Sequence, residues 1–190
     1  ISVGKSGEAK LAVNNFDFSQ IKTLLPAETK LQGEVNAQAF AKWAPNMKPE
    51  VMLNVDMPPG KVEQALEQPI TVGWDSVSFT AALAKDKLDA QWLVDVSDNG
   101  DISGKVSLLN VSAERPEIVG NVALSTLHLD FLAPLIGEYS LFKANMNTDL
   151  ALSGDVMHPK VNGEFLIDQL NLNGEVTPID IDSGQVLINF

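Results

Sequence analysis

Residues 150–190 read LALSGDVMHPKVNGEFLIDQLNLNGEVTPIDIDSGQVLINF and repeat one five-residue unit. The unit is an apolar residue, any residue, Gly, a polar residue and a second apolar residue. Its four instances begin at Leu152, Val161, Leu172 and, more loosely, Asp182. A period of two is typical of a β-strand, because successive side chains of a strand point to opposite faces. The stretch therefore predicts consecutive strands with apolar residues and Gly on one face and polar residues on the other.

The same unit recurs upstream, beginning at Leu31, Ile102 and Ile118, so the whole chain is predicted to be mainly β. With 190 residues the chain is long enough to bury a core as one elongated β domain or two small ones. Ile1 is not an initiator Met and the chain stops inside a strand pattern. We therefore expect residues 1–190 to be a single segment of a longer protein, and the absence of a targeting signal here says nothing about that protein.

Two or three short helices are predicted between the strands, two of them from local signals. The first begins at Ser19, a favourable N-cap, and ends before Pro26. The second is predicted over residues 61–68, between Pro58-Pro59-Gly60 and Pro69. Both are one or two turns long, so they are expected to lie on a sheet rather than to form a layer of their own.

A three-stranded meander is the clearest local prediction. Residues 77–83 and 88–96 alternate apolar and polar on either side of a Lys85-Asp86 turn. Asp98-Asn99-Gly100 then predicts a hairpin turn into a third strand.

A longer segment occurs twice, 111 residues apart: residues 127–147 match residues 16–36. The pattern of both copies predicts a strand, a short helix with an N-cap, a break and a second strand. Just before the second copy the apolar alternation changes parity, which predicts a β-bulge near Ser125-Thr126 or a new element. Self-similarity of this kind is typical of architectures that extend by stacking.

Composition excludes several classes of function. The formal net charge of −12 disfavours nucleic acids and anionic membrane surfaces, both of which are bound largely through Lys and Arg. No window approaches the ~20 apolar residues of a membrane span. The absence of Cys excludes disulfides and thiolate metal sites.

Catalytic candidates are few, and we expect no catalytic residue, metal or cofactor. His128 and His158 do not form a pair at metal-ligand spacing. Asp155 with His158 is more simply a solvated turn than an acid/base pair. Residues 98–101 lack the later bidentate Glu of a calcium loop. The sequence therefore indicates a protein that is not an enzyme.

Three motifs together resemble a known family. Residues 152–165 place a Gly-centred strand before a Pro-led strand that carries a second Gly, and residues 116–122 repeat the Pro-led half. The segment Leu24-Leu25-Pro26 runs into the unit at residues 31–35. These features resemble the AsmA-like proteins of Gram-negative bacteria, and in particular the TamB family. The resemblance covers most of the chain and is strongest over residues 115–190.

The resemblance implies an elongated, U-shaped β-taco sheet with an apolar concave face, lying in the periplasm as part of a protein anchored in the inner membrane. It implies transport of phospholipid, whose acyl chains occupy the groove, toward the outer membrane. It also implies assembly of autotransporters and other outer-membrane proteins, with a TamA-type Omp85 outer-membrane protein and nascent outer-membrane proteins as partners. The family's N-terminal anchor and the segment that meets the outer-membrane partner are not recognisable here.

The residues expected to line such a groove share the apolar phase of the predicted strands. They are Val51, Leu53, Val55, Val77, Phe79, Leu83, Leu88, Trp92, Val94, Val106, Leu108, Val122, Leu124, Leu150, Leu152, Val156, Phe165, Ile167, Val186 and Ile188. Alternating strands also fit the core of a closed β-sandwich binding module. A third alternative is a scaffold or chaperone that binds outer-membrane strands by β-augmentation.

Gly154, Gly163 and Gly174 are in phase with the apolar residues. Because Gly within strands often marks a bend, one hypothesis places the three near the fold of the groove. The alternative is that they serve turns at the starts of strands.

Overall fold

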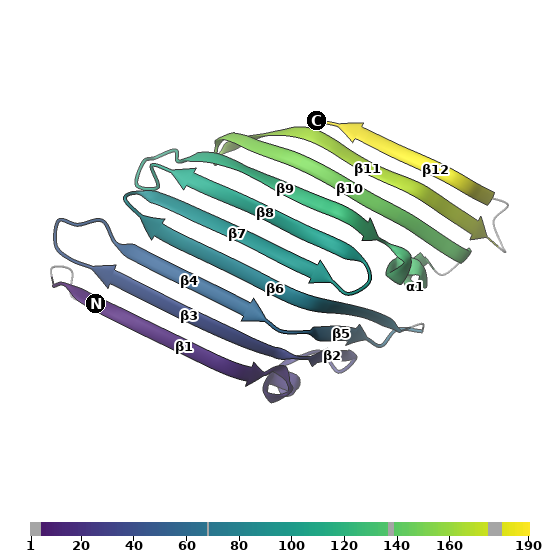
Figure 1. Cartoon of the computed structure of the whole chain (residues 1–190), viewed down its shortest axis with the longest axis horizontal. Helices are drawn as coiled ribbons and strands as arrows, with labels where there is room; N and C mark the ends of the chain where they lie inside the picture. The colour runs from purple at the N-terminus through teal and green to yellow at the C-terminus, as the bar shows by residue number, and fades with distance from the viewer. Residues whose placement is uncertain (1–4, 68, 137–138, 175–179) are drawn as a thin grey trace.

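The computed structural model describes residues 5–67, 69–136, 139–174 and 180–190. Every strand among them belongs to one antiparallel sheet, in the order β1-β3-β4-β6-β7-β8-β9-β10-β11-β12, with β2 pairing β5 and β5 also pairing β6 (Figure 1). The strands are β1 (Gly7–Asp17), β2 (Thr29–Gln32), β3 (Glu34–Trp43), β4 (Glu50–Met57), β5 (Gly60–Gln64), β6 (Ile70–Ala84), β7 (Lys87–Val96), β8 (Gly100–Leu109), β9 (Glu117–His128), β10 (Tyr139–Asp155), β11 (His158–Gly174) and β12 (Asp180–Asn189). The predicted mainly-β, elongated fold is confirmed.

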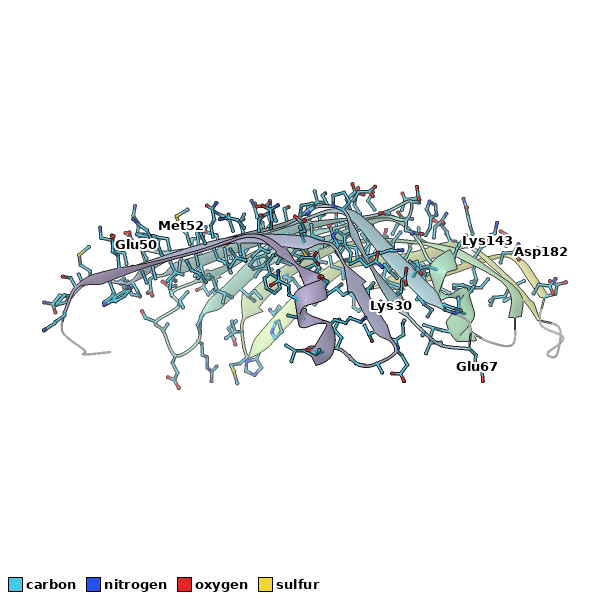
Figure 2. All side chains as sticks on the ribbon, turned by 90° about the horizontal axis from the view of Figure 1, so that it is seen from below. Lys30, Glu50, Met52, Glu67, Lys143 and Asp182 are labelled. Carbon is cyan, nitrogen blue, oxygen red and sulfur yellow. The ribbon has the colours of Figure 1, made fainter. Side chains whose placement is uncertain are left out.

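The sheet is a single curved layer. Figure 2 shows it edge-on as an arch, with Met52 on the convex side and the first helix beneath the concave side. The closed β-sandwich is wrong, because no second sheet packs on this one within the described residues. The apolar residues of the alternating pattern line one open face of the sheet instead.

The predicted meander is confirmed in β6, β7 and β8. Lys85 and Asp86 both have positive φ, 51° and 70°, and form the two-residue turn between β6 and β7. Asp98 (φ 60°) and Gly100 (φ 96°) make the turn into β8. At the Lys85-Asp86 turn, positive φ at both central residues matches the turn to the right-handed twist of the flanking strands.

Four β-bulges cross the sheet in an oblique row, which we call the bulge row. One extra residue interrupts the pairing at each of Asn15 in β1, Asp75 in β6, Thr126 in β9 and Gln169 in β11. The bulge predicted near Ser125-Thr126 is thereby confirmed. Because a bulge bends its strand and increases its twist, the row explains why the sheet arches.

Polar side chains hold each bulge. The backbone N–H of Asn15 donates to Asn36 Oδ1 at 2.8 Å, and that of Thr126 donates to Asn147 Oδ1 at 2.8 Å. At the other two bulges, Ser97 Oγ donates to Asp75 at 2.6 Å and Asn145 Nδ2 donates to Gln169 at 3.0 Å. The first two bonds satisfy backbone N–H groups that the interrupted ladder leaves free, and the other two join side chains across the bulge.

The hypothesis that Gly154, Gly163 and Gly174 mark the line of curvature is wrong. They pair with Pro159, Leu150 and Tyr139, at three different heights on the β10–β11 ladder. Gly154, with φ +99°, lies at the end of β10 before a hairpin turn, Gly163 lies inside β11 and Gly174 ends it, so none of the three stands at the start of a strand as the turn alternative expected.

Three short helical segments join the strands: η1 (Phe18–Leu24), η2 (Asp130–Leu132) and α1 (Ala133–Ile136). The first predicted helix is therefore present, but as a 3₁₀ helix, and its cap is Asp17 rather than Ser19. Asp17 Oδ1 accepts the backbone N–H of Ser19 at 2.7 Å.

The predicted helix over residues 61–68 is wrong. Residues 60–64 form β5, which fills the space between β2 and β6 by pairing with both. Lys61 and Glu63 lie on one face of this strand and form an ion pair at 2.6 Å. Gln68 lies outside the described residues. Strand pairing on both sides outweighed a weak helical spacing.

The concave side of the sheet is covered by other side chains only beyond the bulge row, toward the helices. There Val96, Leu127, Leu129 and Ala144 form the buried cluster, with Leu132 of η2 among the residues packed against it. Near the β1 edge, Phe18 is buried and meets the Trp74 ring edge-on, with 6.5 Å between ring centroids.

Candidate functional site

The candidate site is the concave face of the sheet between its hairpin turns and the bulge row, which we call the apolar face. Strand register brings its residues into rows that run across the strands. One row is Val55, Phe79, Trp92, Gly104, Val122, Leu150 and Gly163, each directly opposite the next. The row shows that period-two alternation in separate strands combines into one continuous surface.

Nineteen of the twenty predicted groove residues lie on this face by their register. Val156 does not, because it occupies the two-residue turn between β10 and β11. The same alternation also places further apolar residues there, which were not selected from the sequence: Leu11, Val13, Ala39, Ile102, Ile118 and Val161.

None of the twenty predicted residues is buried. Val51 and Ile188, near opposite edges of the sheet, remain 37% and 45% exposed, and the central positions are half-buried by their neighbours in the sheet. Residues of a closed core would be covered by a second layer. This face therefore presents a wide apolar surface that other molecules can reach.

Charge is segregated between the two faces. No register position on the apolar face of the described strands carries a charged residue. The convex face carries a row of mostly polar residues across the same strands: Gln38, Asn54, Thr80, Gln91, Lys105, Asn121, Ala151 and Asn162. Figure 2 shows Met52, which is in phase with this row, on the convex side.

Each of the three Trp residues stands directly opposite a Gly on the neighbouring strand: Trp43 opposite Gly7, Trp74 opposite Gly60, and Trp92 opposite Gly104. A Cβ added to any of these glycines would come within 2.3–2.6 Å of the indole. The rings therefore lie over the glycine backbone and cover it. Sequence reasoning missed this arrangement, since the pairs become visible only when the strand register is known.

Thr148 interrupts the apolar face between Leu124 and Phe165. It is 7% exposed, and its Oγ1 has no hydrogen-bond partner among the residues that the structure describes. Its γ-methyl group matches the apolar surroundings, while the hydroxyl bears an uncompensated cost of burial.

The titratable candidates from the sequence do not form an acid/base site. His128 Nδ1 lies 2.6 Å from Asn145 Oδ1, and His158 Nδ1 lies 3.3 Å from Asp155 Oδ1 in an exposed turn. Partial burial raises the pKa of Asp155, but hydrogen bonds from the N–H groups of Met157 and His158 outweigh it and bring that pKa below its ordinary value. Across the described ranges, no group of three His, Asp or Glu residues could hold a metal ion.

An open, curved, single-layer antiparallel sheet that is apolar inside and mostly polar outside is a sheet of the β-taco class. Residues 1–167 match the profile of the family described as "TamB, N-terminal domain", and the chain belongs to this family. The family recognised from the sequence motifs is thereby confirmed.

One curated relative is the "Translocation and assembly module subunit TamB" of Haemophilus influenzae, which is 20% identical over all 190 residues of the chain. The chain spans only 14% of that relative's length. No solved structure matches the chain. Of the helices described, none has the length and apolar character needed to cross a membrane.

Proposed function

We propose that the chain is one segment of a periplasm-spanning bridge that shields phospholipid acyl chains on its apolar face. The observation that carries this proposal is a surface without charge that continues across the strands of the sheet and stays open to solvent. Soluble proteins rarely expose contiguous apolar surface beyond a few hundred Å² unless something binds there.

Acyl chains suit this surface because they need broad contact without directed hydrogen bonds. Each CH₂ group withdrawn from water contributes about 0.8 kcal/mol. The polar convex face and the net charge of −12 keep such an open sheet soluble in the aqueous space between two membranes.

The family and the relative's name support the setting of this function, since that name assigns the relative to a translocation and assembly module. We extend that role to this chain. The parent protein is anchored in the inner membrane of a Gram-negative bacterium and lies in the periplasm. It works with a TamA-type Omp85 protein and supports phospholipid transport and autotransporter assembly, without catalysing a reaction.

A second candidate function rests on the two outer strands. The described sheet ends at β1 on one side and β12 on the other, and among the described residues each of these strands pairs on one side only. An unpaired edge offers backbone groups to an added strand. A nascent outer-membrane strand bound there would give the chain a scaffold or chaperone role alongside lipid shielding.

Photo-crosslinking in cells tests both candidates on the full-length parent protein. A crosslinkable residue replaces Phe79, Leu152 or Phe165 on the apolar face, each matched by its neighbour on the convex face: Ser78, Ser153 or Glu164. Adducts are released and identified as phospholipid or peptide by mass spectrometry.

Lipid shielding predicts phospholipid adducts at the three apolar positions and none at their convex neighbours. Adducts at neither set, or equally at both, contradict it. Peptide adducts confined to probes placed in β1 or β12 favour the scaffold role instead.

A further inference from the structure

Four segments lie at the end of the sheet opposite the helices, and we call them the hairpin rim. They are residues 42–50, 84–87, 109–117 and 155–160, which join β3 to β4, β6 to β7, β8 to β9 and β10 to β11 (Figure 1). The rim holds six of the thirteen Lys and Arg residues but only five of the twenty-five Asp and Glu residues. It therefore carries a formal charge of +1, while the rest of the chain carries −13.

Most of the rim's cations are free to meet another anion. Lys48 is paired with Asp86 at 2.5 Å and Lys87 with Asp89 at 2.7 Å. The other four form no ion pair with any described residue and are exposed: Lys42, Lys85, Arg115 and Lys160.

The opposite end of the sheet differs in both access and charge. Beyond the bulge row the concave side of the sheet is covered around Leu129 and Phe18, both 8% exposed. Acidic residues surround that end, among them Asp98 and Asp130. A phosphate group would meet repulsion there, and a head group would meet a closed surface.

The depth of the open apolar face matches one lipid tail. The depth of the face along β4 is six residues, or about 20 Å, measured from Val51 beside the hairpin rim to Met57 near the bulge row. One leaflet of a bilayer is about 15 Å deep in hydrocarbon, half of the ~30 Å core. An acyl chain lying along the strands therefore stays within the face.

We propose that bound phospholipids lie along the strands, with their phosphate head groups at the hairpin rim and their tails directed toward the helix-covered end. This inference rests on the proposed function and adds the orientation of the lipid and the anionic character of the recognised head group. The unpaired rim cations give the head group its position, and the uncharged face gives the tails theirs.

The three Trp residues lie at three depths and report this orientation. Trp43 stands at the hairpin rim, Trp92 about 20 Å further along the strand direction, and Trp74 about 13 Å beyond that. Three single-Trp variants of the 190-residue chain, with the other two changed to Phe, are loaded with spin-labelled phosphatidylglycerol. The nitroxide is placed either on the head group or at the end of an acyl chain.

The proposal expects the head-group label to quench Trp43 most and the chain-end label to quench Trp92 most, because a tail of about 15 Å that starts at the rim ends near the depth of Trp92 and short of Trp74. The reverse order, or equal quenching at all depths by both labels, overturns the orientation while lipid binding stands. If neither label quenches any Trp and no lipid co-purifies with the wild-type chain, the proposed function itself fails.

Charge reversal tests the rim directly. One variant changes Lys42, Lys85, Arg115 and Lys160 to Glu, and a matched control changes four cations away from the rim: Lys22, Lys30, Lys61 and Lys143. Both lower the net charge by eight, so they separate a local effect from a global one. Circular dichroism and thermal unfolding identify any variant that fails to fold, and single rim substitutions then replace it.

The rim variant is expected to retain at least about tenfold less phosphatidylglycerol than the control variant, and to retain diacylglycerol, which has no phosphate, as well as the control does. Head-group recognition at the rim is contradicted if the rim variant and the control variant lose phosphatidylglycerol equally. It is also contradicted if the rim variant loses diacylglycerol as much as phosphatidylglycerol. Competition by glycerol phosphate alone would show that the rim binds free phosphate rather than a lipid, and would also overturn the proposal.

Discussion

The two bulge-and-helix units, residues 15–36 and the described part of 126–147, share a bulge and two hydrogen bonds in different surroundings. In each, a bulge N–H donates to an Asn side chain 21 residues later, and a buried residue donates across to the next strand: Phe18 to Gly33 and Leu129 to Ala144. The first unit starts in β1, at the edge of the sheet, while the second starts in β9, inside it. Local sequence therefore sets the bulge, and the neighbouring strands set how much of it is buried.

The largest expected effect separates the two buried residues. Leu129→Ala opens a hole inside the buried cluster and should lower the free energy of unfolding by about 3 kcal/mol. Phe18→Ala, at the edge, should cost about 2 kcal/mol despite the larger side chain, because η1 and solvent can move into the space. Urea unfolding of both variants measures this. A larger loss for Phe18→Ala would mean that the edge unit is as tightly packed as the interior one.

The bulge-holding amides should behave alike in the two units. Asn36→Ala and Asn147→Ala each remove an acceptor from a bulge N–H and should each cost about 1 kcal/mol. Gln38→Ala, on the same convex face but without a side-chain hydrogen bond to the described residues, is the control and should change little. If only Asn147→Ala is destabilising, the bulge depends on its surroundings rather than on its own sequence.

Exchanging the bulge residues should give effects of opposite sign. Asn15 and Thr126 both have positive φ, 49° and 48°, a conformation that Asn tolerates and that strains a β-branched residue. Thr126→Asn should therefore stabilise the chain by roughly 0.5–1 kcal/mol, and Asn15→Thr should destabilise it by a similar amount. Thermal unfolding of both variants and of the double exchange checks this. Changes of the same sign would rule out strain as the cause.

The smallest effect distinguishes the helix starts. The backbone N–H of Ser19 lowers the pKa of Asp17, so the stability from this cap is present above the unfolded-state pKa and is lost as pH falls through the lowered folded-state pKa. The second unit has His128 at the matching position, and η2 has no side-chain cap. Acidification should lower the hydrogen-exchange protection factor of the Ser19 amide selectively, and Asp17→Asn should remove this pH dependence. An equal loss of protection at η2 would contradict the assignment.

Strands, hairpins and the bulge at Thr126 were predictable because period two and turn residues are local signals. Residues 61–68 were misassigned because Val62 and Leu66 also fit a helix, and only pairing with β2 and β6 decides between the two. Val156 fitted the apolar alternation yet lies in a turn, because the five-residue unit that begins at Leu152 extends past the end of β10 into the hairpin turn.

The apolar face could be predicted residue by residue, because alternation assigns each side chain to a face. The hairpin rim could not, because the charge of −12 averages over the chain and hides a local excess of Lys and Arg. That excess emerges only when the strand order brings four separate loops to one end.

From β6 to β12, each described strand pairs with the strand that precedes it in the chain. The contacts that hold this half of the sheet are therefore close in sequence, and closing each hairpin costs little loop entropy. Folding can begin at the Asp98–Gly100 turn and spread outward one strand at a time. A chain built this way can start to fold before its later strands have left the ribosome or crossed a membrane.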